Sequence, residues 1–561
     1  MSLNFLNNLI QLGYRYVYRS KGRFYIYLAI FCSLIALLDA TVFHMIRGMR
    51  FRSYDLIMKN RISYHKADSD IIIVDIDEGS LEAMAKEYGR WPWPRQVFAE
   101  FMENLEEQKP RAIVFDILFS DPDVNNPDSD DYFNEVVAST DNTFFPMLRL
   151  SSQNDELSQI KPAMIPGMGK VPGEDQQEKG IALVLPHFTA VIESSRMGTN
   201  NIYPEHDGTV RQYSIYRNHH GWKIPSLPAR ISETFDWGAP PNQNVFLNWR
   251  GKMGSFQTVR FSDVYNDFLS MERKRPQDEF TGKIVIIGST ASALFDTKPT
   301  PMEKVHPGVE ILATAIDNLK NRDWITQTTN PWVFSAVALT LIWLVAIGFL
   351  TGINRKLIDG IFAGSQVGLV AISFASLNLS TYFIDLTVPI TAGLIYFSLA
   401  RVYAYAEVTL MERRMWLNLD GTEKGWQKTT VTVLQLENMK ESSEVKITTA
   451  LKRRLNERKE GFTVESFPHK PAGVGKAFGN MVLIYHVENK VIDKEVSPSE
   501  QGKEIEAIVD EVVKIVCNKI LDRVHLGFSH GAIPYGDDEG RCKVWQKLVT
   551  HAIMDLNAQN A

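Results

Sequence analysis

The chain has 561 residues, of which 45% are apolar and 22% are charged, with a formal net charge of −6 and a mean hydropathy of −0.15. This length allows two or three globular units, and the mild acidity without a basic stripe excludes a nucleic-acid-binding function. The three cysteines, Cys32, Cys517 and Cys542, are too few for a disulfide framework, so each folded unit must rest on an apolar core.

Apolar residues are concentrated in four windows that contain almost no charge. They cover residues 24–46, 331–353, 357–377 and 387–400, and the last of them begins a predicted transmembrane helix over residues 387–407. Each window is close to the ~20 residues that a helix needs to cross a bilayer, and four of them in one chain predict a membrane protein. The first window contains Asp39, an ionisable side chain for which we expect a role in helix packing or at the membrane surface.

Lysine and arginine residues beside these windows indicate the orientation of the chain. They precede the first window, separate the second from the third and follow the fourth: Arg15, Arg19, Lys21, Arg23, Arg355, Lys356, Arg401, Arg413 and Arg414. Because such clusters favour the cytoplasmic side, we expect a bacterial inner-membrane protein with residues 1–23 in the cytoplasm and residues 47–330 in the periplasm. A linker over residues 408–430 then leads to a cytoplasmic domain over residues 431–561. Three arginines run against this rule: Arg47, Arg50 and Arg52.

The periplasmic segment opens with two predicted strands that have acidic ends. Residues 71–74 run into Asp75 and Asp77, and residues 112–115 end at Asp116. Helical patterns separate the strands, over residues 80–88 and 96–108. Continuous apolar strands joined by helices predict a parallel sheet covered on both faces, and therefore an α/β domain. Ligands tend to bind at the carboxyl edge of such a sheet, so the three aspartates are candidate ligand-binding residues.

The sequence Trp91-Pro92-Trp93-Pro94-Arg95 lies between the two helical patterns. Two prolines hold the segment extended, which would present both indole rings and the Arg95 guanidinium to a ligand or a partner. In the alternative interpretation, the rings pack into the core, as is usual for tryptophan, and Pro94 simply begins the next helix. Trp91, Trp93 and Arg95 are therefore ligand-binding candidates with core packing as the alternative.

An acidic loop follows the second strand. Asp121, Asp123 and Asn125 match the first ligand positions of a calcium-binding EF-hand loop. The match fails further on, because Asn126 stands where glycine is required and Tyr132 where a bidentate glutamate is required. We therefore predict no metal site, and expect these side chains to cap turns and the following helix. Asp121 and Asp123 remain candidates for ligand binding.

Two further stretches of the periplasmic segment have a clear pattern. Proline, glycine, glutamine and charged residues predict a long surface loop over residues 151–179. Residues 284–287 predict a third parallel strand, preceded by Gly282-Lys283 and followed by Gly288-Ser289-Thr290-Ala291. Free N–H groups after this strand could bind an anion. No phosphate-loop pattern is present, so the start of a capped helix is the favoured interpretation.

The motifs of the periplasmic segment together resemble one known family. In order they are IIIVDID, WPWPR, IVFDILFSDPD, His206-Asp207-Gly208 with Arg211, Pro225-Ser226-Leu227, residues 282–291, and Pro307-Gly308-Val309-Glu310. This order, over residues 50–322, is similar to the CHASE domain of the second type (CHASE2), an extracytoplasmic sensory domain of bacterial receptors. The resemblance implies a sensor domain upstream of a cyclase, kinase or other output domain, and it implies no particular ligand.

Small residues repeat along the third apolar window. Gly360, Gly364 and Gly368 follow one another at a spacing of four, which places them on one face of a helix. Such a face lets two helix backbones approach closely. The pattern leaves open whether the glycines pack the helices of one chain together or join two chains. We expect the protein to be a homo-oligomer.

The last part of the chain predicts an α+β domain. A strand, a helix, two strands, a helix and a strand are expected at residues 431–436, 442–458, 462–467, 481–486, 504–520 and 524–528. This β-α-β-β-α-β order is the ferredoxin-like one, which nucleotidyl cyclases share.

This domain also resembles class III adenylate and guanylate cyclases. The resemblance rests on the strand that ends at Glu437, on Gly479-Asn480, and on Gly527 and Gly531-Ala-Ile-Pro-Tyr-Gly536. The family's functional residues are replaced: Glu437 and Asn480 stand at the two metal-binding aspartates, and Thr550 and Met554 at the transition-state Asn and Arg. Two magnesium ions and a triphosphate need anionic ligands and positioned cations. We therefore predict a catalytically silent domain that binds a protein partner or, as a cofactor, a nucleotide with magnesium.

Three functions remain open for the whole chain. The first is a signalling receptor that couples the periplasmic domain to a cytoplasmic partner through the silent domain. The second is a structural scaffold of an envelope complex, which uses both domains for oligomerisation. The third is an active class III adenylate cyclase, which would need Glu437 and another carboxylate to hold metal. A ligand-dependent change in the cytoplasmic domain would favour the receptor, and constitutive assembly through the outer domain would favour the scaffold.

Overall fold

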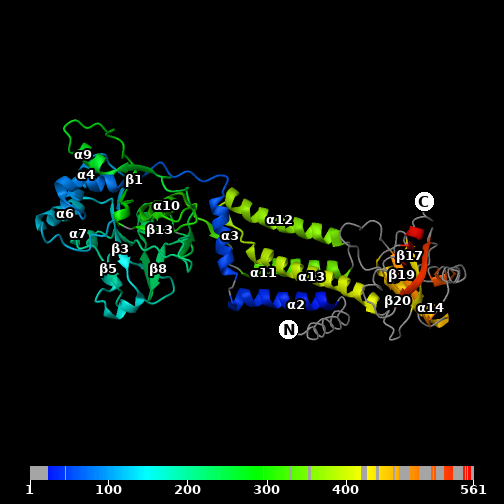
Figure 1. Cartoon of the computed structure of the whole chain (residues 1–561). Coiled ribbons are helices and arrows are strands. Elements are labelled where there is room, and N and C mark those ends of the chain that lie inside the picture. The colour runs from blue at the N-terminus through cyan, green and yellow to red at the C-terminus, as the bar shows by residue number, and fades with distance from the viewer. Residues whose placement is uncertain are drawn as a thin grey trace. The chain divides into compact units, whose positions relative to one another are not determined.

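A computed structural model describes most of the chain (Figure 1). The described residues are 23–43, 46–238, 240–294, 296–327, 331–351, 355–417, 426–436, 441–458, 462–466, 481–491, 507–509, 511–512, 524–534, 548–549, 551–552 and 554–556. The chain divides into two compact units. One consists of Asp39–Ser335 and Gln366–Ile390, and the other of Met1–Leu38, Ala336–Ser365 and Thr391–Ala561. The first unit therefore combines the predicted outer domain with a segment from the third and fourth apolar windows.

A seven-stranded sheet forms the centre of the first unit. Its order is β11-β1-β12-β2-β3-β5, and β6 also pairs with β3. The strands are β1 (Ile71–Asp75), β2 (Ala112–Phe115), β3 (Thr143–Arg149), β5 (Leu183–Val184), β6 (Met197–Thr199), β11 (Gln257–Arg260) and β12 (Ile284–Gly288). All pairs are parallel except that of β3 with β5. The predicted strands at residues 71–74 and 112–115 are thus present and parallel, although β12 lies between them.

Helices cover both faces of this sheet. Every residue of β1, β2 and β12 is buried, as expected for strands that pack on two sides. Ile71 and Ile73 belong to one apolar cluster, whereas Ile72 and Val74 belong to the other. The first cluster includes side chains from α3 (Arg47–Lys59), α8 (Leu227–Thr234) and α10 (Gly308–Asn321). The second includes side chains from α4 (Glu78–Tyr88), α5 (Arg95–Glu106), α6 (Pro127–Ser139), α7 (Thr189–Glu193) and α9 (Phe261–Phe268).

Residues 151–179 are more ordered than a long surface loop, and that prediction is wrong in part. They contain the 3-10 helices η2 (Ser152–Leu157) and η3 (Pro162–Met164) and the strand β4 (Gly169–Lys170). Ile165 is 4% exposed and belongs to the second apolar cluster. Ile160 and Met168 of the same stretch also pack against this cluster, and the polar composition of the stretch gave no sign of these apolar contacts.

Several short strands complete the first unit. β7 (Gln212–Ser214) pairs with β10 (Asn244–Phe246), and β4 extends the hairpin of β8 (Tyr216–His219) and β9 (Trp222–Pro225). β13 (Thr297–Lys298) pairs with β14 (His306–Pro307). The helix predicted to begin after Gly288 is wrong: the chain there contains the 3-10 helix η4 (Ser292–Leu294). Thr290 instead donates its backbone N–H and its hydroxyl to Asp75.

The end of α10 is held by a buried ion network. The Arg250 side chain is 1% exposed and the Asp317 side chain is fully buried, with 2.6 Å between Nη2 and Oδ1. Arg250 also contacts Asp323, with 2.7 Å between Nη1 and Oδ2. Because a buried charge without a partner is strongly destabilising, this network fixes α10 against the loop that follows β10.

The four apolar windows of the sequence are confirmed as helices. They are α2 (Arg23–Leu38), which continues as the π-helix η1 (Asp39–Phe43), α11 (Pro331–Leu350), α12 (Arg355–Leu379) and α13 (Thr387–Leu417). Within the described part of the chain, four helices are long and apolar enough to cross a membrane. At Gly360, Gly364 and Gly368 an added Cβ would meet no described atom within 4 Å, so this face of α12 packs against no other described element.

The C-terminal part contains a four-stranded antiparallel sheet in the order β18-β19-β17-β20. Its elements are β17 (Trp426–Leu436), α14 (Glu441–Arg458), β18 (Phe462–Ser466), β19 (Met481–Val491) and β20 (Val524–Pro534). Of the predicted helix at residues 504–520, the described residues 507–509 and 511–512 are helical. Glu437, Asn480 and Thr550 lie outside the described residues, and Met554 is a helical residue that is 62% exposed.

Candidate functional site

Asp75, Asp77 and Asp116 all lie at the carboxyl edge of the central sheet, as predicted. Asp75 accepts hydrogen bonds from the Thr290 N–H at 2.8 Å and from its hydroxyl at 2.6 Å. Asp77 caps α4 by accepting the Ser80 N–H at 2.7 Å, and it also pairs with Arg260 at 2.8 Å. Burial raises the pKa of Asp75, whereas the hydrogen bonds from Arg260 and Ser80 outweigh burial and lower the pKa of Asp77.

Asp116 has the most unusual environment of these three carboxyl groups. Its Oδ1 accepts a hydrogen bond from the Asn200 amide, whose oxygen in turn accepts one from the Tyr213 hydroxyl at 3.0 Å. Loss of hydration and the neighbouring Asp296 carboxylate raise the pKa of Asp116 well above its usual range. The pKa of Asp296 is also raised by burial. A carboxyl group in this position prefers its neutral form.

The two tryptophans and Arg95 lie at the start of α5. Trp93 is 1% exposed and packs against Phe261, with 5.4 Å between ring centroids, so it is a core residue. Trp91 is partly exposed and lies edge-on to Trp93. The Arg95 guanidinium lies 5.2 Å above the Phe119 ring. Core packing therefore accounts for Trp93 and for most of Trp91, which packs against the second apolar cluster, while Arg95 donates to the Asp121 carbonyl of the acidic loop at 3.5 Å.

Hydrogen bonds within the acidic loop and to Asp130 hold it in place, although Asp130 Oδ1 is buried without a hydrogen-bond partner in the described part of the chain. Asp123 accepts the N–H groups of Asn125 and Asn126, both at 3.1 Å, so it closes a turn as predicted. Its own N–H is donated to Asp130 at 2.7 Å. Asp121 is exposed. Asn126 precedes α6 without a side-chain cap. No group of three or more His, Cys, Asp or Glu that could hold a metal exists among the residues that the structure describes.

The predicted site residues therefore form two groups rather than one. Asp75, Asp77 and Asp116 lie at the sheet edge, while Trp91, Arg95, Asp121 and Asp123 lie around the start of α5. Most of the polar groups have partners within the protein. This arrangement stabilises the edge of the sheet, and the ligand-binding role of these residues stays a prediction.

A different set of residues joins the outer domain to the apolar helices. We call it the collar; it consists of α3, β15 (Thr326–Gln327) and residues 377–385, which include β16 (Tyr382–Phe383). β15 pairs in parallel with β16, and the Ile62 N–H donates to the Asn378 side chain at 2.8 Å. Leu377 and Phe383 are buried in the same apolar cluster as Ile71 and Ile73 of β1. The end of α12 and the chain after it are thus part of the outer domain's core.

The collar also contains an ion pair between distant parts of the sequence. Arg50 of α3 donates to Asp385, whose side chain is only 4% exposed. The second oxygen of Asp385 accepts the Thr387 N–H at 3.1 Å. Arg50 is one of the three arginines that run against the expected charge bias. The ion pair with Asp385 gives the positive charge at this position a structural role.

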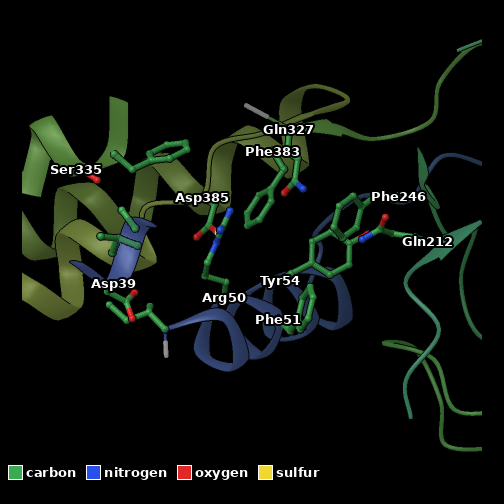
Figure 2. Close-up of a pocket in the computed structure, with 14 residues that line it drawn as sticks. Asp39, Arg50, Phe51, Tyr54, Gln212, Phe246, Gln327, Ser335, Phe383 and Asp385 are labelled. Atoms are coloured by element: carbon green, nitrogen blue, oxygen red, sulfur yellow. The ribbon is translucent and has the colours of Figure 1, made fainter. Parts of the chain in front are cut away.

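A cavity of about 360 Å³ lies beside this ion pair (Figure 2). Its charged lining residues are Asp39, Arg50 and Asp385. Five aromatic side chains line it as well: Phe51, Tyr54, Phe246, Phe334 and Phe383. The Tyr54 ring lies 5.1 Å from Phe246 and 5.5 Å from Phe383 between centroids, and its hydroxyl donates to the Leu247 carbonyl at 3.2 Å. The cavity has the size and the mixed lining of a small-molecule site.

Sequence reasoning missed this cavity for a physical reason. Its lining residues are spread from Asp39 to Val388, and no local pattern brings them together. Two signals did point to it. Asp39 is an ionisable residue in an apolar helix, and Arg50 breaks the charge bias of the flanks.

These observations indicate the class of protein: a membrane protein in which a folded α/β domain shares its core with the end of an apolar helix. The family follows from a comparison with protein-family models. The model described as the CHASE2 domain matches residues 28–353, more than half of the 561 residues, and the chain therefore belongs to the CHASE2 family. CHASE2 is a family of sensory domains. Neither the curated proteins nor the solved structures give a match to this chain.

Proposed function

We propose that the protein is a transmembrane sensory protein in which the collar transmits a change in the outer domain to the apolar helices. One observation carries this proposal: Leu377 and Phe383 are buried in the same cluster as the central strand β1. Because packed interiors transmit strain rather than absorb it, a displacement of the sheet also displaces the end of α12. A continuous helix of 25 residues then carries the displacement away from the domain.

The proposal includes an orientation and an output. We place the protein in a bacterial inner membrane, with the CHASE2 domain in the periplasm and both ends of the chain in the cytoplasm, on the strength of the basic flanks. We assign the C-terminal part to a silent cyclase-like domain that acts by binding a protein partner or a nucleotide. The strand order β18-β19-β17-β20 supports this assignment, because a ferredoxin-like sheet places its first strand between its third and fourth.

The experiment that tests transmission perturbs the collar and reads the C-terminal sheet. The full-length protein in lipid nanodiscs carries R50D, D385R or the exchanged pair R50D/D385R. Each single variant places two like charges together in a largely buried site, which costs several kcal/mol. We expect each single variant to change amide hydrogen exchange in β17 and β19 by about two-fold or more, and the exchanged pair to restore it.

D131N, at an exposed position of α6, serves as the control for a surface charge change. If the single variants lower the thermal midpoint but leave exchange in β17 and β19 unchanged, the outer domain is not coupled to the C-terminal sheet, and a scaffold is the better account. The orientation is checked in the same samples. An impermeant maleimide should label Cys517 and Cys542 in inverted vesicles and not in spheroplasts.

A further inference from the structure

We propose that the cavity beside the Arg50–Asp385 pair is a binding site for an organic cation, an ammonium group carried on an apolar body. The cavity is walled by η1, α3, β10, β16 and the start of α11, all of which belong to the same compact unit (Figure 2). This proposal rests on the function proposed above and adds the chemical class of a ligand that would bind at the collar. Its test measures binding alone and does not depend on signal transmission.

The charged side chains that line the cavity favour a cation. Two of them are aspartates and one is an arginine, so acids outnumber bases. Asp39 is 8% exposed and Asp385 is 3% exposed, whereas the Arg50 side chain is 36% exposed. The other polar side chains of the lining, Gln212, Gln327 and Ser335, are neutral. Asp385 is paired with Arg50, so the charged side chains described around the cavity carry a net charge of one negative unit, which favours a cation over an anion.

The aromatic side chains distinguish an organic cation from a metal ion. The face of an aromatic ring attracts a cation that lies within about 6 Å of its centroid. Phe334 and Phe383 are 7% and 3% exposed, so these two rings are firmly packed in the wall of the cavity. A metal ion requires several oxygen ligands, and the part of the chain that the structure describes holds no cluster of acidic or histidine residues suited to one.

The volume of the cavity limits the size of the ligand that it can hold. About 360 Å³ lies at the lower end of the range for small-molecule pockets. It accommodates an ammonium group with a short apolar body, and it is too small for a phospholipid. Such a ligand would contact Tyr54 of α3 and Phe383 of β16 together, and these two side chains lie on opposite parts of the collar.

The test uses the full-length protein in nanodiscs and two soluble probes of the same shape. Choline carries a quaternary ammonium group, and dimethylbutanol is its uncharged isostere. Calorimetric titration should show choline binding at least ten-fold more tightly than dimethylbutanol. D39N removes one carboxylate without changing the side chain's size, and F383L removes one ring while leaving an apolar side chain. Each should weaken choline binding by about three-fold to ten-fold, while D131N should leave it unchanged.

The outcomes separate this site from its alternatives. Equal affinity for both probes would make the cavity a neutral apolar pocket and overturn the proposal. Choline binding that survives D39N and F383L unchanged would place the site elsewhere, with the same consequence. An absence of binding for either probe up to high millimolar concentration would show that the cavity is only a packing defect. None of these results bears on hydrogen exchange in the collar variants, so the two proposals fail separately.

Discussion

Asp116 shows how a single residue can oppose the stability of the fold around it. Its carboxyl group has a pKa raised well above the ordinary value of 3.8, because it loses hydration and faces Asp296. A raised acidic pKa means that the folded state binds the proton more tightly than the unfolded state. The resulting stability is fully present at pH values below 3.8 and is lost as the pH rises through the folded-state pKa.

The substitution D116N tests this directly. Asparagine keeps an oxygen that accepts the Asn200 hydrogen bond and has no charge to bury. We expect the thermal midpoint of the full-length protein in detergent to rise by a few degrees at pH 7.5 and to change little at pH 4.5, because only the ionised carboxylate opposes burial. D131N is the matched control. A lower midpoint for D116N at pH 7.5 would mean that the carboxylate is needed for the structure.

At the scale of elements, β12 and α10 approach unusually closely. A Cβ added at Gly288 would lie 2.6 Å from Val309 Cγ2 and 3.0 Å from Asp116 Cβ. We expect G288A to destabilise the protein by about 1–3 kcal/mol, because overpacking forces neighbours to move. G288A/V309A should be less destabilised than the sum of the two single variants, as thermal unfolding would measure. G360A, on a helix face where an added Cβ meets nothing described, is the control glycine. An equal loss for G288A and G360A would contradict this account.

Local patterns predicted the elements of this fold better than their arrangement. The runs at residues 71–74, 112–115 and 284–287 are apolar and rich in β-branched residues, and each forms a buried strand. Which strand lies in the middle depends on pairing between residues more than 150 positions apart, and no single window contains that information. The same reason explains the missed cavity and collar. The acidic ends of β1 and β2 were predicted at the correct edge, since that follows from strand direction alone.

At the scale of the whole molecule, the activity of the C-terminal part distinguishes the proposed functions from one another. If the C-terminal part is the silent cyclase-like domain proposed above, with Glu437 and Asn480 at the two metal-binding positions, the full-length protein will form no cyclic nucleotide from ATP or GTP with magnesium or manganese. Calorimetric titration with product assayed in the same tubes measures binding and turnover together, and an active class III cyclase in the same buffer is the control. Binding without turnover would support a nucleotide-regulated receptor. Turnover would contradict the silent domain and restore a cyclase.

The shared core also dictates an order of events during synthesis. The packing around Tyr54 is completed late in synthesis. Tyr54 contacts both Phe246 and Phe383, and Phe383 leaves the ribosome more than 100 residues after Phe246. Until then the α/β domain keeps an open apolar edge. Insertion of the third apolar helix therefore closes the fold of a domain that began about 300 residues earlier, and a chain that stops short of Phe383 would leave that edge open to aggregation.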